Sequence, residues 1–384
     1  MDALISTVIN VVIALAVVGG LFVALNLATD RAPQRWDDRI RPWLFLGPGL
    51  LFLVVGLVVP AVRTIVLSFR GGNDGGEGFT TGNWTGLLGS DTVLSFDRAG
   101  DILTSRLLLA GVLLVVVGIV AAKRSAGPGA GVDLRNPVTN VALGVAVLAV
   151  LMAVFSTLRG VIWNNLWWVV VVAGLATAFG LGLAVLADRS RNEALAKTLI
   201  FMPMAISLVG AAVIWKFIYD VPSSAQSGGL LNIVWPGDNI DFLRSGSIQP
   251  WNNFFIMVIM IWIQAGFAMV VLSAAIKGVP TELGEAARVD GANDAQVFWR
   301  VTLPQITSTI LVVITTLTIT VLKVFDLVKA TTGGVADTDV LANRVYDTLR
   351  GGDFTTSSTY AVMILVLVLP IMYLNIRRNR EEIR

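Results

Sequence analysis

Residues 279–304 of the chain read VPTELGEAARVDGANDAQVFWRVTLP, and this charged stretch lies between two long apolar segments. Pro280 and Thr281 predict the start of a helix with Thr281 as its N-cap. Glu282 and Glu285 follow in the first turn, where the helix dipole favours carboxylates. The stretch therefore predicts a short amphipathic helix between two membrane-spanning segments.

A glycine divides the stretch into two helices. Gly291 adopts positive φ without strain, so it allows a sharp bend at this point. Asn293 or Asp294 is expected to cap a second helix over 295–302, which Pro304 ends just before the next apolar run. The pattern predicts a helix–glycine–helix unit at the membrane surface, where another protein can bind it.

The composition is that of a membrane protein. The chain has 384 residues, of which 55% are hydrophobic and only 14% charged, and its mean hydropathy is +0.77. Soluble domains carry about 25% charged residues. We therefore predict an all-α polytopic membrane protein in contact with membrane lipid, with irregular backbone only at the surface or along a cavity. The net charge of +2 gives no reason to expect a nucleic-acid partner.

The residue types that are missing exclude several activities. The sequence contains no cysteine and no histidine, which removes disulfides, thiol nucleophiles, imidazole bases and the usual zinc sites. It also lacks the G-x4-G-K-[ST] loop that cradles nucleotide phosphates. We expect the chain not to be an enzyme and to bind no metal or cofactor, so that any ATP hydrolysis takes place in a partner subunit.

Apolar runs predict about nine membrane-spanning helices, at about 20 residues each. They are Leu4–Leu27, Trp43–Leu67, Arg106–Ala122, Val138–Leu158, Leu166–Ala187, Leu199–Tyr219, Phe254–Ile276, Ile306–Val328 and Tyr360–Ile376. Loops 29–42, 123–137, 188–198, 277–305 and the C-terminal tail hold most of the basic residues. The positive-inside rule therefore predicts that these loops and the C-terminus are cytoplasmic.

The apolar runs and the loops between them divide the chain into four predicted parts. Residues 1–42 form an N-terminal helix and a basic loop, and 43–105 form a second helix followed by a Gly-rich external loop. Residues 106–158 are expected to be inserted extra helices. Residues 159–384 are the predicted core, which contains the 280–304 stretch. Trp163, Trp167 and Trp168 at the start of this core are expected in an interfacial aromatic belt.

The central stretch resembles the EAA loop of the permease subunits of bacterial ABC importers. The residues that carry the resemblance are Glu285, Ala286, Ala287, Asp290, Gly291, Ala292, Phe298, Leu303 and Pro304. In that family the loop is a coupling helix that docks into a cleft on a cytoplasmic ATPase. The resemblance implies a bacterial inner-membrane protein with a second permease, two ATPase subunits that bind ATP and Mg, and an external solute-binding protein.

Two weaker patterns are similar to sugar permeases of the maltose and α-glucoside type. They are Trp163-Asn164-Asn165, and Thr331-Thr332-Gly333-Gly334 followed by Thr338 and Tyr346. These patterns favour a carbohydrate as the transported substrate.

Within the coupling loop, Glu285 is the main candidate for contact with the ATPase. Its carboxylate can pair with a basic residue of the partner, or it can be a solvated side chain that only stabilises the first turn. Gly291 is expected either to bend the chain or to end the helix. Phe298 can pack on the partner or on its own chain, and the sequence does not decide between them.

Two groups of residues are candidates for the substrate path. Gln264, Gly266, Phe267 and Met269 can hold a sugar through an amide and an aromatic face, or they can form a helix–helix contact. Thr320 and Lys323 on the next helix are the second group, although hydroxyls in helices often bond to the backbone and Lys323 can extend to the interface.

We predict the transmembrane subunit of an ATP-driven carbohydrate importer that works by alternating access. One alternative is an ABC permease for another polar solute, whose cavity should carry more charge. A second alternative is a secondary transporter, which should have charged residues near the middle of its spans. The sequence has no such mid-span charges, and that alternative leaves the coupling loop unexplained.

Overall fold

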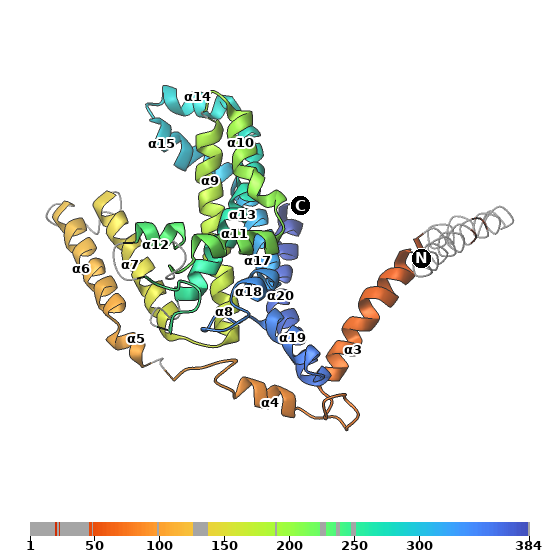
Figure 1. Ribbon diagram of the computed structural model, residues 1–384. Coiled ribbons are helices and arrows are strands. Elements are labelled where there is room, and N and C mark those ends of the chain that lie inside the picture. The colour runs from red at the N-terminus through yellow and green to blue at the C-terminus, as the bar shows by residue number, and fades with distance from the viewer. Residues whose placement is uncertain are drawn as a thin grey trace. The chain divides into compact units, whose positions relative to one another are not determined.

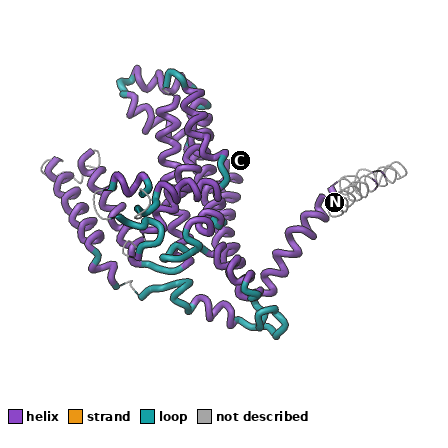
Figure 2. The backbone as a smooth tube through the Cα atoms, viewed as in Figure 1, coloured by secondary structure: helices purple, strands orange, loops and turns teal. Residues whose placement is uncertain are grey.

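The computed structural model consists of helices and the turns that connect them (Figure 1; Figure 2). It describes residues 49–97, 100–125, 137–188, 190–222, 228–235, 239–246 and 251–382, together with residues 20, 23, 46 and 47. In this part of the chain the extended pairings are the isolated bridges Arg70–Phe79 and Ser95–Arg159. The predicted all-α class is confirmed.

The chain divides into two compact units, Met1–Leu67 and Ser68–Arg384. In the first unit, η1 (Val54–Val58) and α3 (Val59–Ser68) belong to one apolar helix over Gly49–Ser68. It corresponds to the predicted second span. The predicted first span, 4–27, lies outside the described residues except for residues 20 and 23, and so does the basic loop 29–42.

The second unit holds the remaining helices. In chain order they are α4 (Gly82–Leu88), α5 (Asp101–Thr104), α6 (Arg106–Ser125), α7 (Pro137–Thr157), α8 (Val161–Trp168), η2 (Val169–Ala173), α9 (Gly174–Asp188), α10 (Glu193–Phe201), η3 (Met202–Ala205), α11 (Leu208–Ile218), α12 (Leu230–Val234), α13 (Trp251–Lys277), α14 (Thr281–Val289), α15 (Asp294–Val297), η5 (Phe298–Thr302), α16 (Leu303–Gln305), α17 (Thr307–Leu322), α18 (Asp326–Thr331), α19 (Leu341–Arg350) and α20 (Phe354–Glu382).

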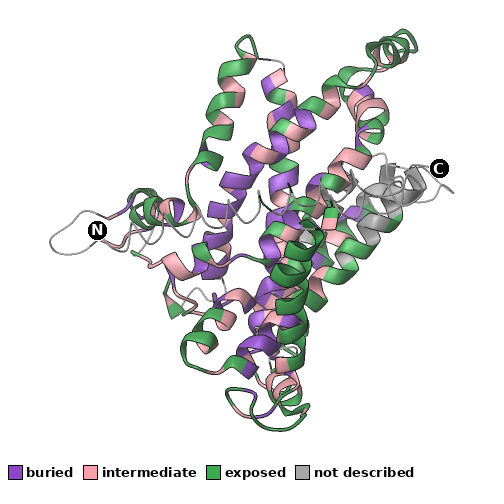
Figure 3. Ribbon diagram, turned by 90° about the vertical axis from the view of Figure 1, so that its right-hand side faces the viewer, coloured by how far each residue is buried: buried purple, intermediate pink, exposed green. Residues whose placement is uncertain are grey.

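Two long helices form the centre of this unit. Helices α8, η2 and α9 run on as one helix of 28 residues, and α13 has 27 residues. They pack closely because Gly180 of α9 has no side chain: a Cβ there would lie 2.4 Å from the Cβ of Ala268. The buried residues follow these helices and α17 (Figure 3). The core thus joins segments that are far apart in sequence.

Two of the tryptophans expected in an interfacial belt belong to this core instead. Trp167 is 8% exposed and Trp168 is fully buried. The indole Nε1 of Trp168 donates to Oδ1 of Asn253 on α13 at 2.7 Å. A buried indole needs such an acceptor, and the amide of α13 supplies it, which is why this side chain turns inward.

The predicted span Leu199–Tyr219 is bent, and a second bend lies at the start of the predicted span Ile306–Val328. The helix from Glu193 to Ala205 meets α11 at 100°, because Pro203 lies in the short 3-10 helix η3 and Ser207 begins a new helix by accepting from the N–H of Gly210. The helix from Asp294 to Gln305 meets α17 at 67°.

The helix expected to stop at Pro304 ends one residue later, because it continues through Gln305. Proline has no N–H to donate to the carbonyl four residues earlier. The preceding turn is the wider π-helix η5, which accommodates the missing bond.

The count of about nine spans is not confirmed. Within the described residues, three helices are long and apolar enough to cross a membrane, or five if each bent pair is one span. Three shorter apolar helical stretches, 108–120, 144–157 and 354–370, lie at the predicted third, fourth and last spans and fall below that length. The division of the chain at 42, 105 and 158 stays a prediction.

Candidate functional site

The 280–304 segment forms the predicted helix–glycine–helix unit at one end of the second unit (Figure 1). Gly291 has φ +87, and a Cβ there would meet nothing within 4 Å. Backbone conformation rather than crowding therefore requires glycine at this bend. The predicted N-cap is wrong by one residue: Pro280 occupies the cap position and Thr281 is the first residue of α14.

The second helix begins with a capping box. The side chain of Asn293 accepts from the N–H of Gln296 at 2.9 Å, and the N–H of Asn293 donates to Oε1 of Gln296 at 2.9 Å. This confirms the asparagine as the cap. The partner glutamine follows three residues later, which is the sequence signature of a capping box.

The segment presents most of its side chains to the outside. Glu285, Ala286 and Asp290 are exposed, and Ala287 and Ala292 are half-buried. Val289 is 87% exposed and Trp299 64%. The segment therefore exposes two large apolar side chains as well as its carboxylates.

A smaller set of side chains attaches the segment to its own chain. Val297 is 7% exposed and, with the half-buried Phe298, lines a cavity of about 180 Å³ against the ends of α9 and α13. Arg288 Nε donates to Asp294 Oδ1 at 3.2 Å and connects the two helices across the glycine bend. Phe298 therefore lies against its own chain, and its ring meets that of Trp299 at a centroid distance of 5.5 Å.

A charge network joins the helix ends beside this segment. Lys197 of α10 lies 2.6 Å from Asp188 of α9 and 2.5 Å from Glu193. Lys277 of α13 also pairs with Glu193, and Ser273 of α13 donates to Asp188 at 2.7 Å. The ends of α9, α10 and α13 are thus held together where α14 begins.

The first candidate group for the substrate path lies on α13. Gln264 is 9% exposed and Met269 is fully buried, while Phe267 is half-buried. A Cβ on Gly266 would lie 2.7 Å from the carbonyl oxygen of Ile200. This close approach to α10 favours the helix–helix interpretation for Gly266, and a sugar contact by the others stays a prediction.

The second candidate group lies on α17. Thr320 is exposed, and its hydroxyl donates to the carbonyl of Thr316 at 2.9 Å. Lys323 is exposed at the C-cap of this helix. The threonine hydroxyl thus donates its hydrogen bond to the backbone of its own helix, as hydroxyls in helices often do. A substrate contact by Lys323 stays a prediction.

At the opposite end of α9 and α13, the two sugar-permease patterns come together. Asn164 of α8 donates through Nδ2 to the carbonyls of Asp337 and Asp339, each at 2.9 Å. Asn165 accepts from the N–H of Leu341 at 2.8 Å. Arg159 pairs with the carboxylate of Asp337. The two asparagines therefore fasten the loop between α18 and α19 to α8.

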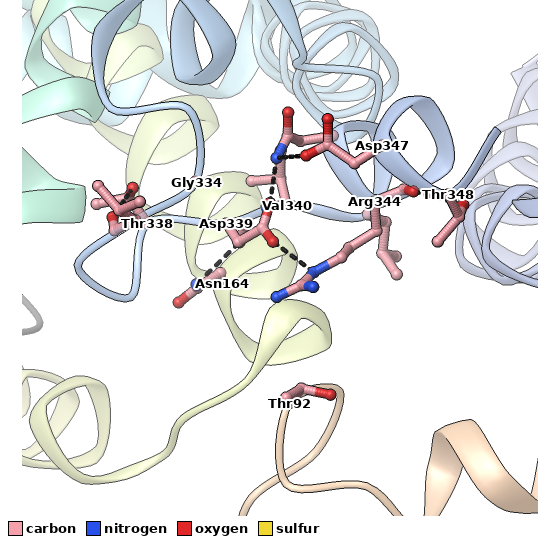
Figure 4. Close-up of polar contacts among 12 residues, drawn as sticks. Thr92, Asn164, Gly334, Thr338, Asp339, Val340, Arg344, Asp347 and Thr348 are labelled. Carbon is pink, nitrogen blue, oxygen red and sulfur yellow. Dashed lines mark hydrogen bonds and ion pairs between the residues drawn. The ribbon is translucent and has the colours of Figure 1, made fainter. Parts of the chain in front are cut away.

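Within that loop, Asp339 is the centre of the contacts (Figure 4). Its carboxylate accepts from Nδ2 of Asn343 at 2.7 Å and from the N–H of Val340 at 2.9 Å, and it pairs with Arg344. Burial nevertheless raises the pKa of Asp339 above its ordinary value. Gly334 has φ +92 and lies against this carboxylate.

We call Asn164, Asn165, Asp337, Asp339 and Asn343, with Arg159 and Arg344, the α8–α19 cluster. Sequence reasoning identified the two asparagines and the residues Thr331 to Gly334 but missed the aspartates and arginines. Asn343 and Asp347 are four residues apart and lie on one face of α19, and Asp339 precedes this helix. This spacing could have indicated the cluster.

A cavity of about 390 Å³ lies at the same end, lined by residues of α11, the 239–246 loop and α18. Lys216 and Arg244 line it together with Asp220 and Asp241. The side chain of Lys216 donates to the carbonyl of Ala330 at 3.5 Å, and that of Arg244 donates to the carbonyl of Thr331 at 3.4 Å. Both cations thus bind the C-terminal end of α18, where the helix dipole favours positive charge.

Known proteins resemble this chain in sequence. Residues 176–376 match the family of binding-protein-dependent transport system inner membrane components. The alpha-glucoside transport system permease protein AglF of Rhizobium meliloti is 38% identical over 398 residues, covering 100% of this chain and 99% of that protein. The osmoprotective compounds uptake permease protein GgtC of Synechocystis is 50% identical over 223 residues, covering 57% of this chain and 79% of that protein.

A solved structure has the same fold. In the bacterial alginate ABC transporter in complex with an alginate pentasaccharide-bound periplasmic protein, one chain superposes with a TM-score of 0.57 at 19% identity. The match covers 91% of this chain and 98% of that chain. At this level of identity the likeness concerns the arrangement of the helices.

Proposed function

Because the chain belongs to the family of binding-protein-dependent transport system inner membrane components, we propose that it is the membrane subunit of an ATP-driven carbohydrate importer for an α-glucoside. The 280–304 segment is the part of the fold that carries the proposal. A helix–glycine–helix unit with exposed carboxylates and an exposed valine is suited to docking in the cleft of an ATPase.

In this proposal, Glu285 forms a charge-assisted hydrogen bond with a basic residue of the ATPase. Ala286, Ala287 and Ala292 are small and let the partner surface approach closely. The charge network holds the ends of α9, α10 and α13 together beside the segment. Movement of the ATPase is then transmitted along α9 and α13 to the α8–α19 cluster, which opens and closes the substrate path by alternating access.

The two ends of the helical bundle are assigned to opposite sides of the membrane. The end that carries the 280–304 segment is cytoplasmic, as is the C-terminus, and the α8–α19 cluster faces the solute-binding protein outside. A second permease and two ATPase subunits complete the transporter in the bacterial inner membrane. The chain itself binds no ATP or Mg, and both belong to the ATPase subunits.

An α-glucoside is the proposed substrate because the relative that covers the whole chain is named for alpha-glucoside transport. Gln264 and Phe267 of α13, with Met269 beside them, and Thr320 and Lys323 of α17 are the proposed contacts. A buried amide together with an aromatic ring is suited to binding neutral hydroxyl groups. Gly266 is assigned to helix packing beside them.

The first experiment compares Glu285→Lys with Glu282→Lys in the complete transporter. Both glutamates are exposed on α14, so the charge change is matched and only the proposed contact differs. We expect Glu285→Lys to lower substrate-stimulated ATPase activity by at least about tenfold, the equivalent of one lost charge-assisted bond. Equal effects of the two variants would contradict the assigned role of Glu285.

The bend is tested by Gly291→Pro against Gly291→Asn. Proline cannot adopt φ +87, whereas asparagine tolerates the left-handed region. Co-purification of the ATPase with the tagged chain should be lost in the proline variant and kept in the asparagine variant. If no ATPase co-purifies even with the wild type, the importer proposal fails.

A second candidate substrate class is osmoprotective compounds, favoured by the 50% identity to the permease GgtC. Uptake of labelled α-glucosides and of charged and neutral osmoprotectants into proteoliposomes with the complete transporter separates the two. We expect a neutral glucoside to be transported and to compete with others of its class. Uptake of a charged osmoprotectant alone would replace the carbohydrate proposal.

A further inference from the structure

The proposed function assigns no role to the α6–α7 hairpin. Its two helices pack tightly on each other: a Cβ on Gly111 of α6 would lie 3.2 Å from the carbonyl oxygen of Ala146 of α7. Outward-facing side chains of both helices are apolar, such as Leu113, 64% exposed, and Val147, 60% exposed. A surface of this kind is stable in lipid rather than in water.

The hairpin meets the core through an aromatic contact at one end of α7. The ring of Phe155 lies edge-on to Trp167 at a centroid distance of 5.2 Å and 5.3 Å from the ring of Trp251. Phe155 and Trp167 are both buried. This contact joins α7 to both central helices, α8–η2–α9 and α13.

Next to that contact, the hairpin and the core border a groove of about 300 Å³. We call it the hairpin groove. Its lining residues come from α7, from α8–η2–α9 and from α13, and none of them is charged. They are Leu151, Met152, Phe155, Trp167, Val170, Val171, Gly174, Leu175, Trp251 and Phe254.

The interior of the hairpin groove is open at Gly174. A Cβ built on this residue would meet nothing within 4 Å, in contrast to Gly180 further along the same helix. The volume is at the lower end of that of small-ligand sites. The groove therefore has room for a slender apolar chain beside α9.

The lining of the groove determines which class of ligand can bind there. A sugar in the groove would lose its hydrogen bonds to water, and the two indole N–H groups are the only polar side-chain groups of the lining. An apolar chain loses nothing there and gains contact with every wall. Val170, 53% exposed, and Leu151, 41% exposed, line the groove from opposite helices and are accessible from outside. In the membrane arrangement of the proposed function, these side chains face lipid.

We propose that the hairpin groove binds one acyl chain of a membrane phospholipid, which fills the space between the α6–α7 hairpin and the core. The lipid completes the packing that the protein leaves open next to Phe155. This inference concerns the fold rather than the coupling segment and does not depend on which substrate the transporter carries.

The test uses the full chain in vesicles of phosphatidylethanolamine and phosphatidylglycerol that contain a phospholipid with a photoreactive diazirine on one acyl chain. Peptides labelled after illumination are identified by mass spectrometry. Gly174→Phe fills the groove, and Gly182→Phe is its matched control, since Gly182 lies on the same helix, also has open space around it and does not line the groove.

We expect the wild type to be labelled at residues 151–155 and 170–175. Each methylene displaced from apolar contact weakens association roughly fourfold. Gly174→Phe should therefore lower this labelling by about fifteenfold when two methylenes are excluded, and Gly182→Phe should leave it unchanged. Gly174→Leu, a smaller substitution at the same open position, should give an intermediate decrease if the phenylalanine variant does not fold.

Two results would overturn the proposal. Equal labelling in wild type and Gly174→Phe would show that only bulk lipid touches this surface. Labelling that is present in the isolated chain but absent from the assembled transporter would show that a helix of a partner subunit fills the groove. Transport and ATPase activity are not needed for either readout, so failure here leaves the proposed function to its own test.

Discussion

The 280–304 segment and the α8–α19 cluster lie at opposite ends of the same bundle, and they use their polar groups in opposite ways. In the segment, Glu285 and Asp290 are exposed. In the cluster, Asn164 and Asp339 are buried and bonded to neighbouring parts of the chain. The comparison separates a surface built to meet a partner from a network built to hold its own loop in place.

The difference predicts how each region responds to mutation. A buried polar group that loses its partner costs about 1–3 kcal/mol, whereas an exposed side chain usually contributes less than about 0.5 kcal/mol to stability. Substitutions in the cluster should therefore affect folding first and transport as a result. Substitutions in the segment should affect coupling and leave the fold intact.

The largest effect is expected for Gly334→Ala. A Cβ at this position would lie 2.7 Å from both Nδ2 of Asn343 and Oδ1 of Asp339, and the residue has φ +92. Left-handed strain and overpacking together should lower the stability of the protein by about 2–5 kcal/mol, measured by thermal unfolding in detergent.

The neighbouring Gly333→Ala is the matched control for that substitution. It has φ +70 and nothing within 4 Å, so it should cost only the backbone term of about 1–2 kcal/mol. Equal losses in the two variants would mean that the cluster adjusts to the added methyl group and is not tightly packed.

A somewhat smaller effect is expected for Asn164→Leu. The substitution keeps the size of the side chain and leaves the carbonyls of Asp337 and Asp339 without their donor. We expect a loss of about 2–4 kcal/mol. Glu285→Leu, the comparable change in the segment, should remain within about 0.5 kcal/mol of wild type. If Glu285→Leu destabilises the protein as much, the segment is part of the fold and not a free surface.

Two valines of the 280–304 segment allow an exposed and a buried side chain of the same type to be compared within one region. Val289 is 87% exposed and Val297 is 7% exposed. Val289→Ser should leave the melting temperature unchanged and weaken the affinity for the ATPase by about tenfold, since burying a valine contributes about 1.5 kcal/mol or more. Val297→Ser should lower the melting temperature instead. The reverse pattern would assign docking to the buried face.

Much of the segment was predictable from sequence because its signals are local. Gly291, Asn293 and the two short helices follow from caps and backbone preferences that act over a few residues. The same reasoning placed the N-cap at Thr281 instead of Pro280, since a cap position depends on one pair of dihedral angles.

The cluster was only partly predictable because its contacts join residues about 175 positions apart, such as Asn164 and Asp339. No local rule pairs them. The bends at Pro203 and after Pro304 also depend on packing, so counting apolar runs could not show which runs are broken helices. Hydropathy indicates the membrane but not the path of the chain within it.

The smallest expected effect concerns the pH dependence of the cluster through Asp339. Burial raises its pKa above the ordinary 3.8, although Asn343 and Arg344 act in the other direction and Asp347 adds to the increase. A group with a raised pKa binds its proton more readily in the folded state, so it stabilises the fold fully below pH 3.8. That stabilisation is lost as the pH rises through the pKa of the folded state.

Relative to Asp339→Asn, which stays neutral, the wild type should therefore lose stability as the pH increases above about 4. Thermal unfolding of both proteins in detergent across the acidic range gives the difference directly. If the wild type instead gains stability relative to the variant as the pH rises, the ion pair with Arg344 outweighs the cost of burial. In that case, the cluster would be held by charge, and the contrast with the exposed carboxylates of the 280–304 segment would lie in pairing rather than in burial.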